Sequence, residues 1–138
     1  MKTAAPEKPA LTVEGYFAES VKRGHKVTEQ ELSNATQLIE KVNALLDEFG
    51  ERRGQNSGHR TREKSLDLRA KGYAAAIGGT HETANGIDLE DEDSLLKNWL
   101  DEGILARYGL YMEHPSATRR WVHLQRVPPR SGRRIFYP

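Results

Sequence analysis

The feature that most constrains the fold is one long amphipathic stretch, residues 28–49. Thr28 and Glu31 have the T-x-x-E spacing of a capping box, in which a hydroxyl and a carboxylate satisfy free backbone amides reciprocally. Apolar residues then recur at helical spacing, and Gly50 is a typical C-terminal stop. The apolar positions are Leu32, Ala35, Leu38, Ile39, Val42, Leu45, Leu46 and Phe49. This pattern predicts a helix from about Thr28 to Phe49 with one face in the core.

Shorter elements are expected on both sides of this helix. Residues 1–10 contain two prolines and are interpreted as a flexible leader. The segment "LTVEGYFAES" is expected to dock through Tyr16 and Phe17, and "GERRGQNSG" (50–58) is expected to be a loop. A short helix bearing Leu66, Leu68 and Ala70 should end near Gly72.

The second half of the chain predicts one more helix and several strands. The helix is expected from about Asp91 to Glu102, with acidic residues in its first turn and with Leu95, Leu96, Trp99 and Leu100 facing inward. Strands are expected in "RYGLYME" (107–113), in "RRWVHLQRV" (119–127) and, briefly, in "RRIFYP" (133–138). A long helix followed mostly by strands predicts an α+β fold, and 138 residues suit a single domain.

Composition narrows the chemistry that is open to this chain. It has no cysteine, which excludes disulfides, thiolate metal sites and thiol nucleophiles, so that a metal must rest on His, Asp and Glu. The net charge of +1 gives no overall attraction to nucleic acid or membrane. The N-terminus "MKTAAPEKPA" lacks the apolar region of a secretory signal, and no run approaches transmembrane length. We therefore expect a protein made in the cytoplasm that leaves it only if another system carries it out.

Three side chains are candidates for a metal site. The stretch "GGTHETANGIDLED" (78–91) separates His81 from Asp88 by small, turn-prone residues. His123 lies on an expected strand, where alternation places it on the same face as Trp121 and fixes its ring. Two nitrogens and one carboxylate oxygen suit zinc. A His and an Asp at this spacing also occur by chance, and a strand histidine is more often hydrogen-bonded than metallated, so both interpretations stay open.

The same residues carry a resemblance to a known family. "THETANGID" resembles the S-x-H-x-x-G-x-A-x-D motif of the M15 family of zinc D-Ala-D-Ala peptidases, relatives of the hedgehog signalling domain. "WVHLQ" resembles the second histidine strand of that family, and "SGHR" (57–60) resembles its upstream S-G-Y-R. These segments occur in the family's order across residues 57–125, and the segment from Gly109 to the C-terminus resembles the end of small bacterial and phage members.

The resemblance implies a fold, a metal and a reaction. The implied fold is a small antiparallel sheet flanked by helices, in which His81, Asp88 and His123 bind zinc. The implied reaction is zinc-assisted hydrolysis of a peptide bond in the D-amino-acid-containing stem peptide of peptidoglycan, with a carboxylate accepting the proton of the attacking water. Arg60 would hold a substrate carbonyl or carboxylate and stabilise developing negative charge; the alternative for Arg60 is a surface charge or a structural ion pair.

The sequence departs from the family pattern in three respects. The serine two residues before the first histidine is Gly79 here, and the G-x-A pair is reversed as Ala84 and Gly86, although both residues remain small. Many members place an acidic general base three residues before the last histidine, where this chain has Arg120. An arginine cannot accept a proton at neutral pH, so the base must come from elsewhere.

Glu113 is the nearest upstream acid and the first candidate for that base. The loop after it can fold back and bring Glu113 to the metal, or the neighbouring His114 can contribute. Alternatively, Glu113 is a strand-end residue that pairs with one of the arginines. Glu82 is a second candidate, but it directly follows an expected ligand and should point away from the metal if the backbone is extended.

The leading functional prediction is a zinc peptidase of the cell wall, either a carboxypeptidase that removes a terminal D-Ala or an endopeptidase (lysin). The N-terminus favours a phage-type or separately delivered protein that acts at the wall after release. A catalytically inert zinc-binding module, such as a virion or cell-wall attachment protein, is the alternative that Arg120 favours. We expect a monomer. Nucleic acid is a third and less expected partner. The candidate contacts for nucleic acid are Arg119, Arg120, Arg126, Arg130, Arg133 and Arg134, interleaved with Trp121 and Phe136.

Overall fold

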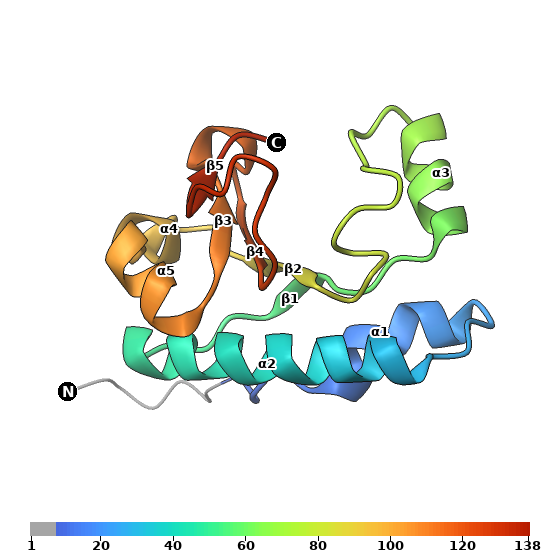
Figure 1. Ribbon diagram of the computed structural model, residues 1–138, viewed down its shortest axis with the longest axis horizontal. Helices are drawn as coiled ribbons and strands as arrows, with labels where there is room; N and C mark the ends of the chain where they lie inside the picture. Colours follow the sequence, from blue (N-terminus) through green and yellow to red (C-terminus); the bar gives the residue numbers. More distant parts are fainter. Residues whose placement is uncertain (1–7) are drawn as a thin grey trace.

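A computed structural model describes residues 8–138, and the fold is α+β as predicted (Figure 1). Of the expected leader, residues 1–7 lie outside the described residues. The sheet has five strands in the order β1-β2-β4-β3-β5, and all neighbours pair antiparallel except β3 and β5, which are parallel. The strands are β1 (Gln55–Ser57), β2 (Gly86–Glu90), β3 (Tyr111–Glu113), β4 (Trp121–Gln125) and β5 (Ile135–Phe136). The expected antiparallel sheet therefore has one parallel edge.

The long predicted helix is present as α2 (Glu29–Phe49), which runs along one side of the molecule beside α1 (Val13–Lys22) (Figure 1). Its capping box is formed, because the Thr28 hydroxyl accepts the Glu31 amide at 3.1 Å and the Glu31 carboxylate accepts the Thr28 amide at 2.9 Å. Gly50 ends the helix at a φ of 88°. The predicted apolar face is buried apart from Phe49, which is partly buried, and Leu32, whose exposed fraction is 49%.

Helix α1 docks as the sequence predicted, through Tyr16 and Phe17, which are both buried. The Tyr16 hydroxyl donates a hydrogen bond of 2.6 Å to the backbone carbonyl of Gly86, at the start of β2. Burial raises the pKa of this phenol, so it stays a donor at any physiological pH. Helix α1 is thereby connected directly to the strand that carries Asp88.

Three predicted elements differ from the structure. The expected loop 50–58 contains β1, which pairs with β2. The expected helix Asp91–Glu102 is wrong as a single element: it is replaced by α4 (Leu95–Trp99) and α5 (Glu102–Tyr108). The chain is extended at Leu100, and the Asp101 carboxylate then caps α5 by accepting the Ile104 amide at 2.8 Å. Since α5 runs through Tyr108, the strand expected over 107–113 is shortened to β3.

The remaining elements lie close to where they were expected. Helix α3 (Arg62–Ala70) ends two residues before Gly72, although Leu66 on it is 53% exposed. Strands β4 and β5 occupy the predicted segments, and a short 3-10 turn, η1 (Pro115–Ala117), precedes β4. Within residues 8–138, no helix is both long and apolar enough to cross a membrane.

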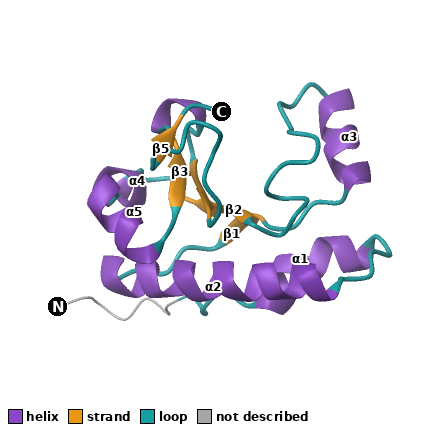
Figure 2. Cartoon of the chain, in the orientation of Figure 1, coloured by secondary structure: helices purple, strands orange, loops and turns teal. Residues whose placement is uncertain are grey.

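The central strands β2 and β4 present two different faces. Ile87, Leu89, Val122 and Leu124 point into the core that α1 and α2 share. The alternate positions of both strands point to the opposite side, which faces the loops 71–85 and 126–134 (Figure 2). Strand alternation therefore sends apolar side chains to one face and Asp88 and His123 to the other.

Candidate metal centre

The three candidate ligands meet at one point on that open face. Asp88 and His123 are direct partners in the β2–β4 register, which brings Nδ1 of His123 to 2.8 Å from Oδ1 of Asp88. His81 precedes β2 and brings its Nε2 to 3.3 Å from the same carboxylate oxygen. One ligand atom from each residue lies within 4.8 Å of the others. The predicted convergence of these side chains is therefore present.

A tight turn places His81 beside the strand. The Thr80 carbonyl accepts the amides of Asn85 at 2.8 Å and Gly86 at 3.1 Å, and Ala84 adopts a left-handed φ of 62°. A Cβ added at Gly86 would overlap the Thr80 side chain and lie 3.1 Å from Cε1 of His123. The small residues of this stretch thus allow the turn to close directly over the ligand face.

The hydrogen bond behind His81 determines which of its nitrogens can bind a metal. Nδ1 lies 2.8 Å from the backbone carbonyl of Gly58. A carbonyl can only accept, so Nδ1 carries the hydrogen, and Nε2 of the neutral ring keeps a free lone pair. That lone pair faces the carboxylate of Asp88.

Gln125 orients His123 in the same way. The Gln125 amide nitrogen donates to the carbonyl of Val127 at 2.8 Å, so its Oε1 is the acceptor that lies 2.9 Å from Nε2 of His123. Nε2 therefore carries the hydrogen, and Nδ1 faces Asp88 with a lone pair. Two imidazole lone pairs and a carboxylate oxygen then face one another, an arrangement that a proton or a metal cation must neutralise.

The charges of the metal-free site reflect this arrangement. Burial by itself would raise the pKa of Asp88, but hydrogen bonds from His123 and His81 outweigh it and the pKa is lowered. Burial would likewise lower the pKa of His123, but its hydrogen bond to Asp88 and the charges of Asp88 and Glu113 raise it. Both shifts favour an ionised Asp88 carboxylate with a proton on His123.

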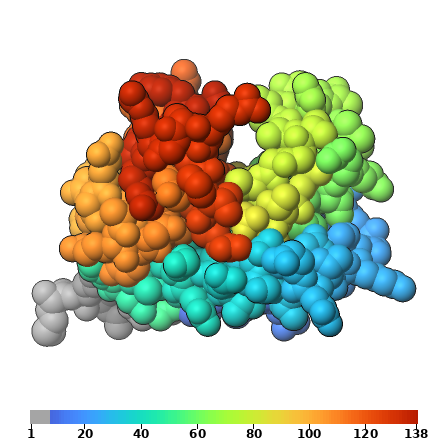
Figure 3. Space-filling model, in the orientation of Figure 1, coloured from blue at the N-terminus to red at the C-terminus, as the bar shows by residue number. Residues whose placement is uncertain are grey.

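The site lies in a cleft of about 460 Å³ between the segment around Ala74–His81 and the C-terminal segment, visible as a hollow in Figure 3. Trp121 and His123 both line it, as the predicted strand alternation requires. Aromatic side chains of Phe136 and Tyr137 and the cationic side chains of Arg60 and Arg130 complete the lining. A volume of this size fits a small ligand or a short peptide segment.

Arg60 is at the centre, and part of its guanidinium is engaged. Its Nη2 lies 3.3 Å from Oδ2 of Asp88, and its Nε donates to the Ser57 hydroxyl at 3.1 Å. The ion pair that was the alternative for this residue is therefore formed. Because a guanidinium has five N–H donors, further donors remain for a ligand.

Glu113 also lines the cleft, and its charge contributes to the raised pKa of His123. Its carboxylate makes no hydrogen bond or ion pair with the described residues, so the alternative pairing with an arginine is not observed. His114 instead caps η1, contacts Ser116 at 2.8 Å and stacks on Tyr137. Of these two neighbours, only Glu113 faces the metal centre.

The other two charged candidates point elsewhere. The Glu82 carboxylate accepts from Nε of Arg62 at 2.7 Å and from the Gly78 amide at 2.6 Å, so it points away from His81 as predicted. Arg120 is exposed, and its backbone carbonyl accepts the Asp91 amide. Arg120 does not belong to the lining of the cleft, so the side chain at the family's usual base position does not reach the centre.

The arginine-rich C-terminal segment is partly used by the fold itself. Arg126 donates to Asn34 at 2.8 Å, and Arg134 lies over the ring of Tyr111 and donates to the Leu110 carbonyl at 3.1 Å. Structural roles for these two reduce the number of arginines that are free to contact phosphate.

Sequence reasoning missed the groups that orient the ligands. Gln125 is two residues after His123 on the same strand face, and that spacing was a usable signal. Ser57 and Gly58 belong to the "SGHR" segment that the resemblance singled out, but their contacts with Arg60 and His81 were not predicted, because these groups reach the centre only through the pairing of β1 with β2. Comparison with protein-family models, curated proteins and solved structures finds no match to this chain.

Proposed function

We propose that this protein is a zinc peptidase that hydrolyses D-amino-acid-containing peptides of the peptidoglycan stem. The proposal rests on one observation: the imidazoles of His81 and His123 converge on the Asp88 carboxylate, and the other nitrogen of each ring is hydrogen-bonded to an acceptor behind it. These side chains line a cleft that Glu113 also lines. The substrate class is inferred from the resemblance of residues 57–125 to the M15 motifs.

Zinc is the metal that this donor set fits best. His81, Asp88 and His123 would supply two nitrogens and one oxygen, which is the number and kind of protein ligands typical of a catalytic zinc with a remaining open position. When bound, zinc supplies a Lewis acid that polarises a carbonyl and makes water easier to deprotonate.

Glu113 would transfer protons, and Arg60 would bind the substrate carbonyl. Glu113 has a free carboxylate facing the centre, so it would accept the proton of the attacking water and deliver it to the leaving amine. Arg60 would direct its unused N–H donors to the substrate carbonyl and stabilise the negative charge that develops there. The aromatic wall of Trp121, Phe136 and Tyr137 would pack against the peptide and exclude water.

Hydrolysis of purified peptidoglycan and of a D-Ala-D-Ala peptide tests the proposal, with and without a chelator. Hydrolysis is expected to require the metal, and the L-Ala-L-Ala isomer is expected not to be hydrolysed. Glu113→Gln should lower the rate by about 10²–10⁴-fold with metal content unchanged, because it removes the proton acceptor and leaves the ligands intact. Glu40→Gln is the matched control, since Glu40 is exposed on α2 and does not line the cleft, and it should remain active. Full activity of Glu113→Gln would remove Glu113 as the base.

A catalytically inert zinc-binding module is the second candidate. Two observations favour it: Arg120 stands where many family members have the base, and Arg60 already pairs with Asp88. Such a module predicts stoichiometric zinc without cleavage of either substrate. Zinc lost on chelation with no hydrolysis before or after would select it over the peptidase.

A further inference from the structure

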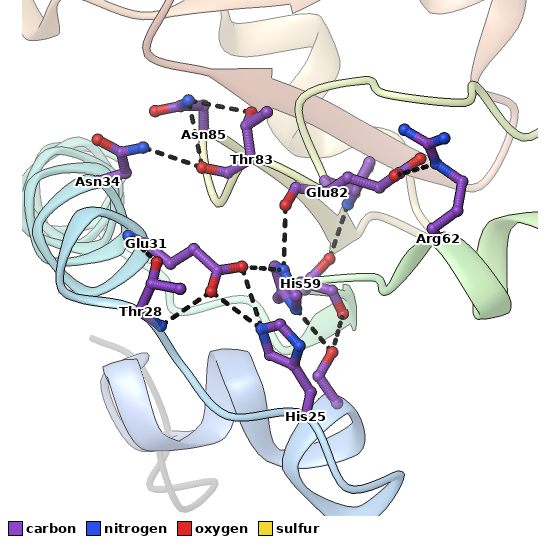
Figure 4. Close-up of polar contacts among 12 residues, drawn as sticks. His25, Thr28, Glu31, Asn34, His59, Arg62, Glu82, Thr83 and Asn85 are labelled. Atoms are coloured by element: carbon purple, nitrogen blue, oxygen red, sulfur yellow. Dashed lines mark hydrogen bonds and ion pairs between the residues drawn. The ribbon is translucent and has the colours of Figure 1, made fainter.

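A second cluster of histidines lies below the first centre, on the side of α1 and α2. His25 is in the turn between the two helices, Glu31 is in the first turn of α2, and His59 follows β1 (Figure 4). One ligand atom from each lies within 4.8 Å of the others. The ring centroids of His25 and His59 are 4.9 Å apart, similar to the 5.2 Å between His81 and His123.

Both clusters are built on one carboxylate oxygen that faces two imidazoles. Oε2 of Glu31 lies 2.8 Å from Nε2 of His59 and 3.1 Å from Nε2 of His25. The corresponding distances from Oδ1 of Asp88 at the first centre are 2.8 and 3.3 Å. Oε1 of Glu31 lies 2.9 Å from Nε2 of His25 and also accepts the Thr28 amide of the capping box. The helix cap thus fixes the carboxylate, with Oε2 facing both rings and Oε1 facing His25 as well.

Ser20 determines the hydrogen on His59. Its hydroxyl lies 2.7 Å from Nδ1 of His59 and donates to the backbone carbonyl of His59 at 3.2 Å. A hydroxyl has one hydrogen, so both contacts are hydrogen bonds only if Nδ1 carries the ring hydrogen and donates to Ser20. Nε2 then points a lone pair at Oε2 of Glu31 and at the Glu82 carbonyl, which is 3.1 Å away.

We propose that His25, Glu31 and His59 form a second site for a divalent transition-metal ion such as Zn²⁺, with the backbone carbonyl of Glu82 as a further oxygen donor. A cation can bind the lone pairs of the rings, the carboxylate and the carbonyl at once. A hydrogen on Nε2 of His59 would instead have to be shared between Oε2 of Glu31 and the Glu82 carbonyl. His59 is buried with a side-chain exposure of 1%, and His25 at 27% leaves an entry path for the ion.

The position of this site gives it a structural role. The chain from Gly58 to Arg60 passes between the two clusters: the Gly58 carbonyl orients His81, His59 belongs to the second cluster, and Arg60 contacts Asp88. The Arg60 amide also donates to the His81 carbonyl at 3.1 Å. An ion on His59 would tie this segment and the His81 turn to the N-terminus of α2.

The test is a Zn²⁺ titration of the metal-free full chain, read by metal analysis after dialysis and by isothermal calorimetry. Wild type should bind two ions per chain, one for each cluster. His25→Gln should bind one, because it removes a partly exposed ligand without disturbing the core. His81→Gln should also bind one, and the combined variant none. His114→Gln changes a histidine outside both clusters and should still bind two.

Each outcome of the titration bears on the second site. A wild-type chain that binds one ion, with His25→Gln unchanged, would overturn it. If wild type binds a single ion, which His81→Gln keeps and His25→Gln loses, the second site stands and the proposed peptidase centre fails. Folding is checked by thermal unfolding of the metal-free proteins: His25→Gln and wild type should melt together without Zn²⁺, and His25→Gln should show the smaller rise in Tm when Zn²⁺ is added.

Discussion

At the scale of single residues, the groups behind the ligands decide what the histidines can do. A neutral imidazole has one N–H and one lone pair, so an acceptor on one side of the ring makes the other side a ligand. The Gly58 carbonyl plays this part for His81 and the Gln125 amide oxygen for His123. The lone pairs of both rings then face the Asp88 carboxylate, as a metal centre requires. These outer contacts distinguish a metal centre from an ordinary hydrogen-bonded cluster, in which N–H groups would face the carboxylate.

Gln125→Met tests the role of these outer contacts. It keeps the side-chain size but removes the acceptor from Nε2 of His123, so the ring loses the group that fixes its tautomer. Affinity for Zn²⁺ at the His81 centre should fall by about 10–100-fold, measured by competition with a chromophoric chelator. Gln37→Met changes an exposed glutamine on α2 and should leave the affinity as in wild type. Wild-type affinity in Gln125→Met would contradict a positioning role.

At the scale of elements, the sheet register and the docking of α1 build the centre. Register pairs Asp88 with His123, and strand alternation keeps Ile87 and Leu124 in the core beneath them. Helix α1 is linked to the same strand by the Tyr16 hydroxyl, which reaches the Gly86 carbonyl at the end of the His81 turn. A change in α1 therefore acts directly on the turn that carries a ligand.

Tyr16→Phe should destabilise the fold although it removes only one oxygen atom. The Gly86 carbonyl would lose a buried hydrogen bond, at a cost of about 1–2 kcal/mol. Urea unfolding measures this as a lower midpoint with an unchanged slope. Tyr137→Phe is the control: Tyr137 is 72% exposed, so the loss of its hydroxyl should leave the midpoint unchanged. An equal midpoint for Tyr16→Phe would show that this bond does not stabilise the fold.

At the scale of the whole molecule, the apolar core and the lobe across the cleft, residues 60–85, are stabilised by different kinds of contact. Of the core cluster, residues 60–85 contribute only Ala84. Polar contacts hold this lobe instead, among them the bonds that the Glu82 carboxylate accepts from Arg62 and from the Gly78 amide. One wall of the cleft consequently depends on charges, and its stability should depend on pH.

The acid sensitivity of the metal-free protein should show this dependence. Burial would raise the pKa of Glu82, but the Arg62 hydrogen bond and the Gly78 amide outweigh it, so the folded pKa is lowered from its ordinary value of 4.5. The Glu82 contribution is then present above about pH 4.5 and is lost as the pH falls through the lower folded pKa. We expect a loss of about 1 kcal/mol, because Arg62 is exposed.

Glu82→Gln isolates that contribution from the other carboxylates. Thermal unfolding of chelator-treated wild type and Glu82→Gln should differ at pH 7, and the difference should shrink as the pH falls from about 4.5 through the lowered folded pKa. A difference that stays constant over this range would show that the ionised Glu82 carboxylate does not stabilise the lobe.

Local patterns in the sequence were enough for α2, for β4 and for the three candidate ligands of the first centre. Helical spacing, a capping box and strand alternation are short-range properties, so they can be recognised without knowing what packs against them. The expected helix over 91–102 failed because the chain is extended at Leu100 and a new helix begins after the Asp101 cap, and apolar spacing reports neither feature. Leu32 and Leu66 lie on helical stripes but remain exposed, because the packing partner of a position is not encoded in its spacing.

By itself, the sequence determined the fold class and the residue types that can bind a metal: without cysteine, the ligands had to be His, Asp and Glu. Only the tertiary structure decided which of them meet. His25, Glu31 and His59 come from three separate segments, and Glu31 had been explained by its helix cap alone. The physical reason is that a metal site requires lone pairs a few ångströms apart in space, and segments distant in sequence reach that geometry only when the core has packed.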